Sequence, residues 1–288
     1  MSLERVGVDD LRNLLLGGAR WIDVRAPLEF SKGHLPGAVN LPLLNDRERA
    51  AVGTAYKQQG PEAAIALGHR LVQGPVKQAR VQAWLEAAKE GAAFLYCFRG
   101  GLRSQISQKW LNEAGVLLPL LEGGYKAGRN FLLNETQRLC EASRFLVIAG
   151  ATGSGKTHLL TTLPKGKSIV DLEGLAAHRG SAFGALDRAQ PSQGVFENRL
   201  ALTLMKSRAQ GADAPIVLED ESWTIGKVTL PPALYHRMAE APLVLVTEPL
   251  ESRVERIFED YVRDPLLQDE PSKVFGRFEA SFAVLEKR

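Results

Sequence analysis

Short apolar runs alternate with helical patterns along the whole chain of 288 residues. Two runs, residues 92–96 and 145–149, have the length and composition of buried strands, and each leads into a glycine-containing loop and a helical pattern. Further strands are expected at residues 21–24, 116–121, 168–172, 215–221 and 243–246. This alternation predicts an α/β protein with parallel sheets.

Helical spacing predicts where the domains divide. Helices are expected at residues 5–17, within 45–90, at 126–142, at 196–208, from about 251 and at 272–288. The length suits two domains, each large enough for its own core. We place them at 1–140, with 126–142 as the linker helix, and 141–288. The last helical pattern reaches residue 288 without a cap, and we expect the natural protein to continue past it.

Composition limits the class of protein. Hydrophobic residues make up 45% and charged residues 24%, which is ordinary for a soluble globular protein. No apolar run approaches the ~20 residues of a membrane span, and the first residues lack an export signal. Two cysteines make no disulfide framework, so we expect a cytoplasmic protein without a membrane partner. Residues 1–140 carry 18 lysine and arginine against 13 aspartate and glutamate residues, and residues 141–288 carry 18 against 20.

Residues 145–157, FLVIAGATGSGKT, carry the clearest motif, because their second half fits G-x-x-x-x-G-K-[ST]. Glycines let successive backbone N–H groups face a phosphate, the lysine reaches an outer phosphate, and the threonine hydroxyl can hold a metal ion. The predicted phosphate-binding residues are Gly150, Gly153, Ser154, Gly155, Lys156 and Thr157. The motif leaves the identity of the phosphate compound open.

Two other segments are expected beside this loop. The strand at residues 215–221 ends in acids, the pattern of a metal- or water-positioning strand, which favours a role for Asp220 or Glu221. Residues 172–184, LEGLAAHRGSAFG, place His178 and Arg179 where a loop over the phosphates would lie. Mg²⁺ is the candidate ion, and the sequence leaves the need for it open.

A second anion cradle is predicted after residue 96. Cys97 ends a strand and leads into the loop FRGGLRS, whose backbone N–H groups and whose Arg99 and Arg103 favour a thiolate near neutral pH. The spacing from Cys97 to Arg103 is C-x5-R, which is also that of phosphatases and suits a tetrahedral oxyanion such as phosphate or selenophosphate. Cys140 lies in a helical pattern and is predicted to be structural.

The first domain resembles a rhodanese. Residues 23–42, DVRAPLEFSKGHLPGAVNLP, are similar to the signature near the start of rhodanese domains through Asp23-Val24-Arg25, Glu29-Phe30, Gly33-His34 and Pro36-Gly37-Ala38. Asp23 and Arg25 can brace the neighbouring loops. In rhodaneses the positions of Glu29 and His34 are scaffold residues, so we do not expect them to be catalysts.

Several motifs together resemble the bacterial tRNA 2-selenouridine synthases over nearly the whole chain. They are NDRERAAVGTAYKQQGPEAA (45–64), CFRGGLRS (97–104), EGGYKAGR (122–129), GATGSGKT (150–157), LEGLAAHRGSAFG (172–184) and LEDES (218–222). The resemblance implies an N-terminal rhodanese-like domain with a parallel sheet and a C-terminal P-loop NTPase-like α/β domain. Phe98 stands where we would expect tryptophan.

The resemblance implies a reaction in two steps. The sulfur of the wobble 2-thiouridine of a tRNA is first alkylated by geranyl diphosphate, and selenium from selenophosphate then replaces it. Lys156 and Thr157 would neutralise the departing diphosphate, Cys97 would take or guide the selenium, and Arg99 and Arg103 would hold the phosphate-like group. No cofactor is expected to be tightly bound.

The resemblance also names partners. They are the tRNA anticodon loop and the synthetase that makes selenophosphate, as its deliverer. We expect the positive first half to seat the anticodon loop, with Phe98 and Tyr125 as candidates for base stacking.

Two other classes of function stay open from the residues. One is a C-x5-R phosphatase joined to a kinase-like domain, against which stands Tyr96 at the position where phosphatases usually have histidine. The other is a non-catalytic module whose binding is gated by a nucleotide. Conversion of thiolated tRNA, release of phosphate from an aryl phosphate, or tight nucleotide binding without turnover would distinguish the three.

Overall fold

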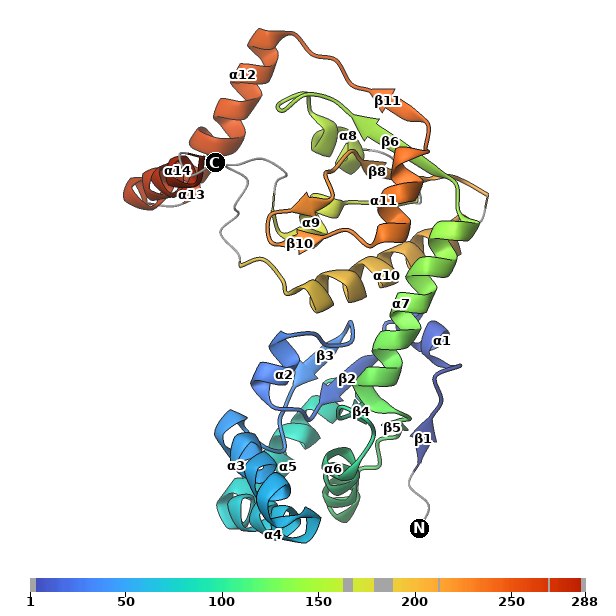
Figure 1. Cartoon of the computed structure of the whole chain (residues 1–288), viewed down its shortest axis with the longest axis vertical. Helices are drawn as coiled ribbons and strands as arrows, with labels where there is room; N and C mark the ends of the chain where they lie inside the picture. Colours follow the sequence, from blue (N-terminus) through green and yellow to red (C-terminus); the bar gives the residue numbers. More distant parts are fainter. Residues whose placement is uncertain (1–3, 163–167, 179–188, 212, 269, 286–288) are drawn as a thin grey trace. The chain divides into compact units, whose positions relative to one another are not determined.

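The computed structural model describes residues 4–162, 168–178, 189–211, 213–268 and 270–285. The chain divides into two compact units, Met1–Asn134 and Glu135–Arg288. Each unit has its own sheet of parallel strands, and Figure 1 traces their elements. The division falls within helix α7 (Gly124–Ala142), close to the helix expected at 126–142.

The first unit has a five-stranded parallel sheet in the order β1-β5-β4-β2-β3. Its elements before α7 are β1 (Arg5–Val6), α1 (Leu11–Leu16), β2 (Arg20–Asp23), α2 (Pro27–Ser31), β3 (Ala38–Asn40), α3 (Asp46–Gln59), α4 (Pro61–Leu71), α5 (Gly74–Lys89), β4 (Ala92–Tyr96), α6 (Leu102–Glu113) and β5 (Leu120–Leu121). The helix expected at 5–17 is wrong at its start, because Arg5 and Val6 pair with β5 as an edge strand. The long apolar run at 116–121 supplies only a two-residue strand.

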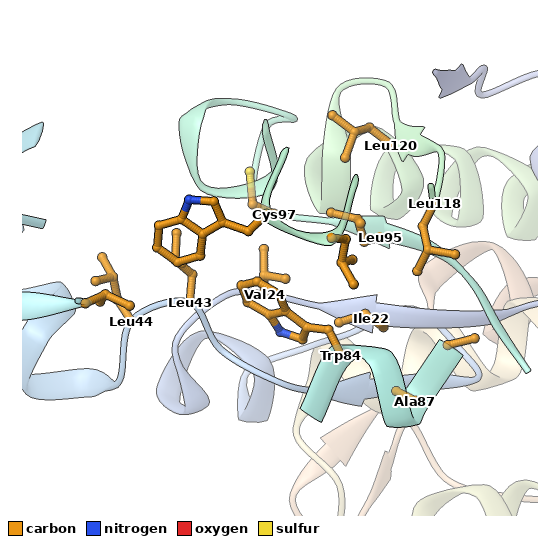
Figure 2. Close-up of a cluster of buried hydrophobic side chains, with 14 residues drawn as sticks. Ile22, Val24, Leu43, Leu44, Trp84, Ala87, Leu95, Cys97, Leu118 and Leu120 are labelled. Atoms are coloured by element: carbon orange, nitrogen blue, oxygen red, sulfur yellow. The ribbon is translucent and has the colours of Figure 1, made fainter. Parts of the chain in front are cut away.

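The core of the first unit lies between the sheet and helices α5 and α6. Figure 2 shows its buried side chains, which come from β2, β4, β5, these helices and the segment after β3. Trp84 and Trp110 stack with their ring centroids 6.3 Å apart, and the Trp84 indole N–H donates to the Leu41 carbonyl at 2.9 Å. A buried indole needs such a partner, so this contact fixes α5 against the end of β3.

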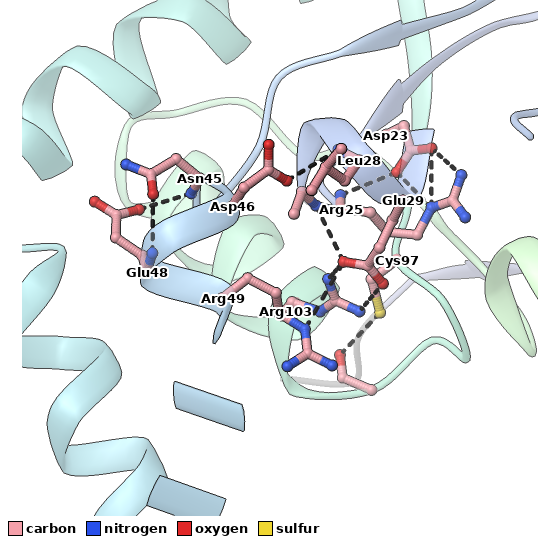
Figure 3. A network of polar contacts seen from close by, with 12 residues as sticks. Asp23, Arg25, Leu28, Glu29, Asn45, Asp46, Glu48, Arg49, Cys97 and Arg103 are labelled. Atoms are coloured by element: carbon pink, nitrogen blue, oxygen red, sulfur yellow. Dashed lines mark hydrogen bonds and ion pairs between the residues drawn. The ribbon is translucent and has the colours of Figure 1, made fainter. Parts of the chain in front are cut away.

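Helix α3 begins with a capping box. The Asn45 side chain accepts from the Glu48 N–H at 2.9 Å, and the Glu48 carboxylate accepts from the Asn45 N–H at 2.7 Å. Asp46 accepts from the Leu28 N–H at 2.9 Å, as Figure 3 shows. The motif at residues 45–64 is therefore tied to helix α2, which carries Glu29.

The second unit has a four-stranded parallel sheet in the order β11-β6-β8-β7. Its elements after α7 are β6 (Phe145–Ala149), α8 (Lys156–Thr162), β7 (Ile169–Val170), α9 (Leu172–Ala176), α10 (Gln193–Gln210), β8 (Ile216–Glu219), β9 (Thr224–Ile225), β10 (Val228–Thr229), α11 (Pro232–Ala239), β11 (Leu243–Leu245), α12 (Leu250–Phe258), the π-helical turn η1 (Glu259–Arg263), α13 (Asp264–Gln268) and α14 (Pro271–Leu285). The β9–β10 hairpin and α11 were not predicted.

Strand pairing in the second unit decides where its polar residues meet. Strand β8 lies directly beside β6, with Ile148 opposite Glu219. The carboxyl ends of parallel strands reach the same edge of a sheet, so the acids after β8 are brought to the loop after β6. Within the described residues, no helix is both long and apolar enough to span a bilayer.

Candidate active sites

Cys97 lies at the carboxyl end of β4 and is only 3% exposed. Its Sγ is 3.2 Å from the Ser104 hydroxyl and 3.8 Å from the Gly101 carbonyl oxygen, and the Ser104 hydroxyl also donates to that carbonyl at 3.0 Å. Figure 2 shows the sulfur pointing away from the core cluster and toward the loop that follows. The thiol is therefore buried beneath the loop that follows it, in contact with residues of that loop.

The loop after Cys97 is clamped by the start of α7. The Tyr125 N–H donates to the Cys97 carbonyl at 2.8 Å, and the Lys126 N–H donates to the Phe98 carbonyl at 3.0 Å. Gly124 has a φ of +58°, and a Cβ there would collide with the Cys97 carbonyl and lie 2.7 Å from the Gly100 nitrogen. The close approach therefore requires glycine. The sequence indicated this glycine pair only as part of the motif EGGYKAGR (122–129).

Arg103 and Arg99 have different surroundings. Arg103 makes two hydrogen bonds to the Glu29 carboxylate, at 2.5 and 3.0 Å, and Arg49 lies 3.8 Å from the same carboxylate. Burial opposes ionisation of Glu29, but the hydrogen bonds and charge of Arg103 outweigh it and lower the pKa of Glu29. Arg99 is exposed, with its guanidinium carbon 5.6 Å from the centroid of the Phe98 ring.

Glu29 therefore has a role that the sequence did not reveal. It was expected to be a scaffold residue, and it orients Arg103, which follows Cys97 by six positions. Figure 3 shows the dashed contacts between Arg103 and Glu29, with Cys97 in the same view. Because the two residues of this ion pair are 74 positions apart, only the fold could bring them together.

Asp23 and Arg25 form the brace that the sequence predicted. The Arg25 guanidinium makes three hydrogen bonds to the Asp23 carboxylate, at 2.6 to 3.0 Å, and donates to the Gly33 carbonyl at 2.7 Å. Its carbon also lies 3.9 Å from the centre of the Tyr125 ring. Burial alone would lower the pKa of Arg25, but the Asp23 carboxylate outweighs it and raises the pKa. Tyr125 is thus buried under an arginine, which leaves Phe98 as the exposed aromatic of the two stacking candidates.

The glycine-rich loop after β6 borders a cavity of about 700 Å³. Gly153 and Gly155 have φ values of +79° and +83°, which let the backbone curl there. The Lys156 ammonium donates to the Gly150 carbonyl at 2.5 Å, bridging the loop's two ends. The predicted residues that line the cavity are Gly153, Ser154, Gly155, Lys156, Thr157, Asp220 and Glu221.

The acids around this cavity include one that the sequence missed. Glu173, in α9, lines the cavity, and its carboxylate accepts from the Thr157 hydroxyl at 3.2 Å. Burial, and then the charge and hydrogen bond of Glu173, raise the pKa of Glu221 to about 7. Glu219 is buried and accepts from the Glu173 N–H at 2.8 Å, and burial raises its pKa to about 8. Glu173 lies in the first turn of α9, three residues after the end of β7, and this place at the carboxyl end of a strand could have identified it.

Helix α12 supplies a cation to the same cavity. The Arg256 guanidinium donates to the Gly153 carbonyl at 2.8 Å and lines the cavity. No motif in the sequence indicated it. His178 is not among the lining residues; its backbone N–H donates to the Glu173 carbonyl at 3.1 Å. Arg179 lies outside the described residues.

Among the described residues, carboxylates line this cavity, but they do not gather into a ready-made site for Mg²⁺. The part of the chain that the structure describes has no group of three or more metal-ligating side chains. Mg²⁺ usually takes one or two carboxylates together with phosphate oxygens. The Thr157 hydroxyl with Glu173 or Asp220 would be such a set, completed by a bound diphosphate, so these residues fit Mg²⁺ only with that ligand present.

Comparison with known proteins decides the family. The family model described as the tRNA 2-selenouridine synthase AAA domain matches residues 143–283, and the rhodanese-like domain model matches residues 7–130. The chain is 52% identical to a tRNA 2-selenouridine synthase of Nitrosomonas europaea, over 89% of this chain and 67% of that protein. The chain belongs to the tRNA 2-selenouridine synthase family. The predicted α/β fold of a rhodanese-like domain followed by a P-loop domain is confirmed.

Other tRNA 2-selenouridine synthases agree. That of Hahella chejuensis is 54% identical over 88% of this chain and 66% of its own length, and that of Bdellovibrio bacteriovorus is 44% identical over the whole chain and 81% of its own length. The chain thus spans about two thirds of the length of the first two relatives. As a member of the tRNA 2-selenouridine synthase family it is an enzyme.

Proposed function

We propose that this enzyme replaces the sulfur of the wobble 2-thiouridine of tRNA by selenium, by way of a geranylated intermediate. Family membership supports the tRNA substrate and the selenium product. The observation that carries the proposal is that one chain holds a cysteine in an enclosed glycine-rich loop and, in its other unit, a P-loop cavity with a lysine, an arginine and acids. The two steps need these two chemistries.

The first step is assigned to the P-loop cavity. The thiocarbonyl sulfur attacks C1 of geranyl diphosphate, so an S–C bond forms while a C–O bond breaks and diphosphate leaves with the electron pair. The N3 proton of the uracil ring is released to solvent, which leaves the alkylated base neutral. Lys156, the backbone N–H groups around it and Arg256 neutralise the charge that develops on that leaving group. Alkylation also turns a poor leaving group into a thioether.

The second step is assigned to the Cys97 loop. Selenium of selenophosphate attacks C2 of the uracil ring, the C–Se bond forms, the C–S bond breaks, and geranyl thiolate leaves with the electron pair. Water then hydrolyses the Se–P bond and releases phosphate. Cys97 guides the selenium without bonding to it, and Arg99 is the exposed arginine for the phosphate-like group, since Arg103 already pairs with Glu29. That pairing also argues against the phosphatase alternative, because the arginine of a C-x5-R loop would have to bind the phosphate itself.

The tRNA and its cellular setting follow from the same assignment. The excess of positive charge in residues 1–140 suits the phosphates of an anticodon loop, and Phe98 is exposed for stacking on an unpaired base. We expect the synthetase of selenophosphate to deliver the donor, and we expect the enzyme to act in the cytoplasm, where tRNA is modified.

Nucleoside mass analysis tests the division of labour. Thiolated tRNA is incubated with geranyl diphosphate and then with selenophosphate, using wild type and two variants. Cys97→Ser should stop selenation and leave geranylation, whereas Lys156→Ala should stop geranylation and leave the conversion of pre-geranylated tRNA. If both variants lost only nucleotide hydrolysis, the proposal would be wrong.

A further inference from the structure

Helices α3, α4 and α6 of the first unit enclose a second cavity, of about 620 Å³. This volume lies within the roughly 300–1,000 Å³ of sites for small molecules. Leu102 and Arg103, in the first turn of α6, line the cavity and also belong to the loop that begins at Cys97. The cavity therefore adjoins the loop to which we assign selenium transfer.

The walls of this cavity are mainly apolar. Its buried lining includes Leu43, Val72 and Trp110. Around it, Leu102 is 54% exposed and Ile65 is 39% exposed, although both are large hydrophobic residues. A mainly apolar cavity with a few polar groups is the usual form of a binding site for a small molecule. The lining therefore suits a hydrocarbon.

The lining also carries cations. Arg49, Lys57 and Arg103 belong to it, and the Glu29 carboxylate, which pairs with Arg103 and lies 3.8 Å from Arg49, balances one of these charges. Arg49, Lys57 and Arg103 together with Glu29 therefore carry a net positive charge. A hydrocarbon chain attached to a polyanion such as RNA would match both features, because the chain enters the apolar space while phosphates meet the cations.

We propose that this cavity binds the prenyl chain of the S-prenylated uridine in tRNA and thereby holds the thioether at the Cys97 loop. The inference rests on the proposed function and names the residues that recognise its intermediate. Free prenyl diphosphate is the other source of such a chain. The structure favours the RNA-bound chain, because the glycine-rich loop, Lys156 and Arg256, to which we assign the diphosphate, lie in the other unit.

A side chain at position 68 can fill the cavity without disturbing the fold. Gly68 lies in α4 and lines the cavity, and a Cβ there would have its nearest neighbour, a Val52 methyl, at 3.9 Å. Leucine also favours a helix more than glycine does. Ala66→Leu, at an exposed position of the same helix outside the lining, is the matched control.

The probe is an anticodon stem–loop RNA with S-geranyl-2-thiouridine at the wobble position, compared with the same RNA carrying 2-thiouridine. Each buried methylene is worth about fourfold in affinity. Gly68→Leu, by displacing two or more carbons, should raise the Kd for the geranylated RNA by roughly tenfold or more. It should leave binding of the 2-thiouridine RNA and the KM for geranyl diphosphate unchanged, and Ala66→Leu should change none of these.

Wild type supplies a second measurement. Affinity should rise from S-methyl to S-butyl to S-geranyl RNA, and Gly68→Leu should flatten this rise. If Gly68→Leu raised the KM for geranyl diphosphate instead, or changed nothing, the assignment of the cavity would be overturned. If wild type did not convert thiolated RNA at all, the proposed function itself would fail, which is a different result.

Discussion

Gly124→Ala tests whether the start of α7 shapes the Cys97 loop. The added Cβ would meet the Cys97 carbonyl oxygen, and it would lie 2.7 Å from the Gly100 nitrogen and 3.0 Å from the Arg99 nitrogen. All three are backbone atoms, so no flexible side chain can move aside. The φ of +58° adds a second cost, because L-residues disfavour the left-handed region.

The magnitude can be worked from these two terms. The left-handed conformation costs an alanine about 1–2 kcal/mol, and overpacking against fixed atoms costs about 1–3 kcal/mol. The variant should therefore lose about 2–5 kcal/mol of the free energy of unfolding, a large share of the roughly 5–15 kcal/mol of a typical domain. Gly115→Ala is the matched control, because its φ is +86° but nothing lies within 4 Å of its Cβ. It should show only the first cost.

Urea unfolding followed by tryptophan fluorescence measures the difference. Three of the four tryptophans, Trp21, Trp84 and Trp110, are buried in the first unit, so the signal reports chiefly on that unit. Gly124→Ala should also lose selenation while geranylation, assigned to the other unit, persists. Equal stability of the Gly124 and Gly115 variants, together with normal selenation, would refute the reasoning.

Two further predictions concern buried groups. Asp23→Asn leaves the Arg25 guanidinium buried with a neutral partner and should lower the free energy of unfolding by about 3–5 kcal/mol in the same urea assay. The control Asp9→Asn, at an exposed position, should change it by almost nothing. A loss below about 1 kcal/mol for Asp23→Asn would contradict the role of the pair. Burial raises the pKa of Cys140 from 9.0 to about 12. At pH 8 its thiolate population, and hence its rate of alkylation by iodoacetamide, should therefore be about a thousandfold lower in the native protein than in urea. Peptide mass analysis measures both rates, and equal rates would contradict the prediction.

Local motifs were predictable because the spacing of a few residues fixes their geometry. Gly150 to Thr157 and the loop after Cys97 are of this kind, since a strand, a glycine turn and a helix start follow one another in the chain. The edge strand at Arg5 and Val6 was not predictable, because two residues become a strand only through their partner β5. The helical spacing of the residues that follow therefore led to a predicted helix that included Arg5 and Val6.

The parts of the sites that escaped prediction depend on contacts distant in the chain. Glu29 meets Arg103 across 74 positions, and Arg256 reaches Gly153 across 103. A glutamate or arginine in a helical pattern is usually a solvated side chain, so nothing local distinguishes these. The cavity between α3, α4 and α6 likewise follows from how three helices pack, and the sequence marked residues 45–64 only as a motif of the family resemblance.

The burial of Cys97 makes sense if the two ligands of the second step have separate spaces. The sulfur is almost covered and lies against Ser104 in a loop that is clamped at Gly124, so we place the ten-carbon chain outside this loop. The neighbouring apolar cavity has the volume and lining for that chain, and Arg103 borders both. A prenyl group would then be more than a chemical activator of sulfur, because its binding beside the loop would bring C2 of the uridine to the selenium while excluding unmodified thiouridine.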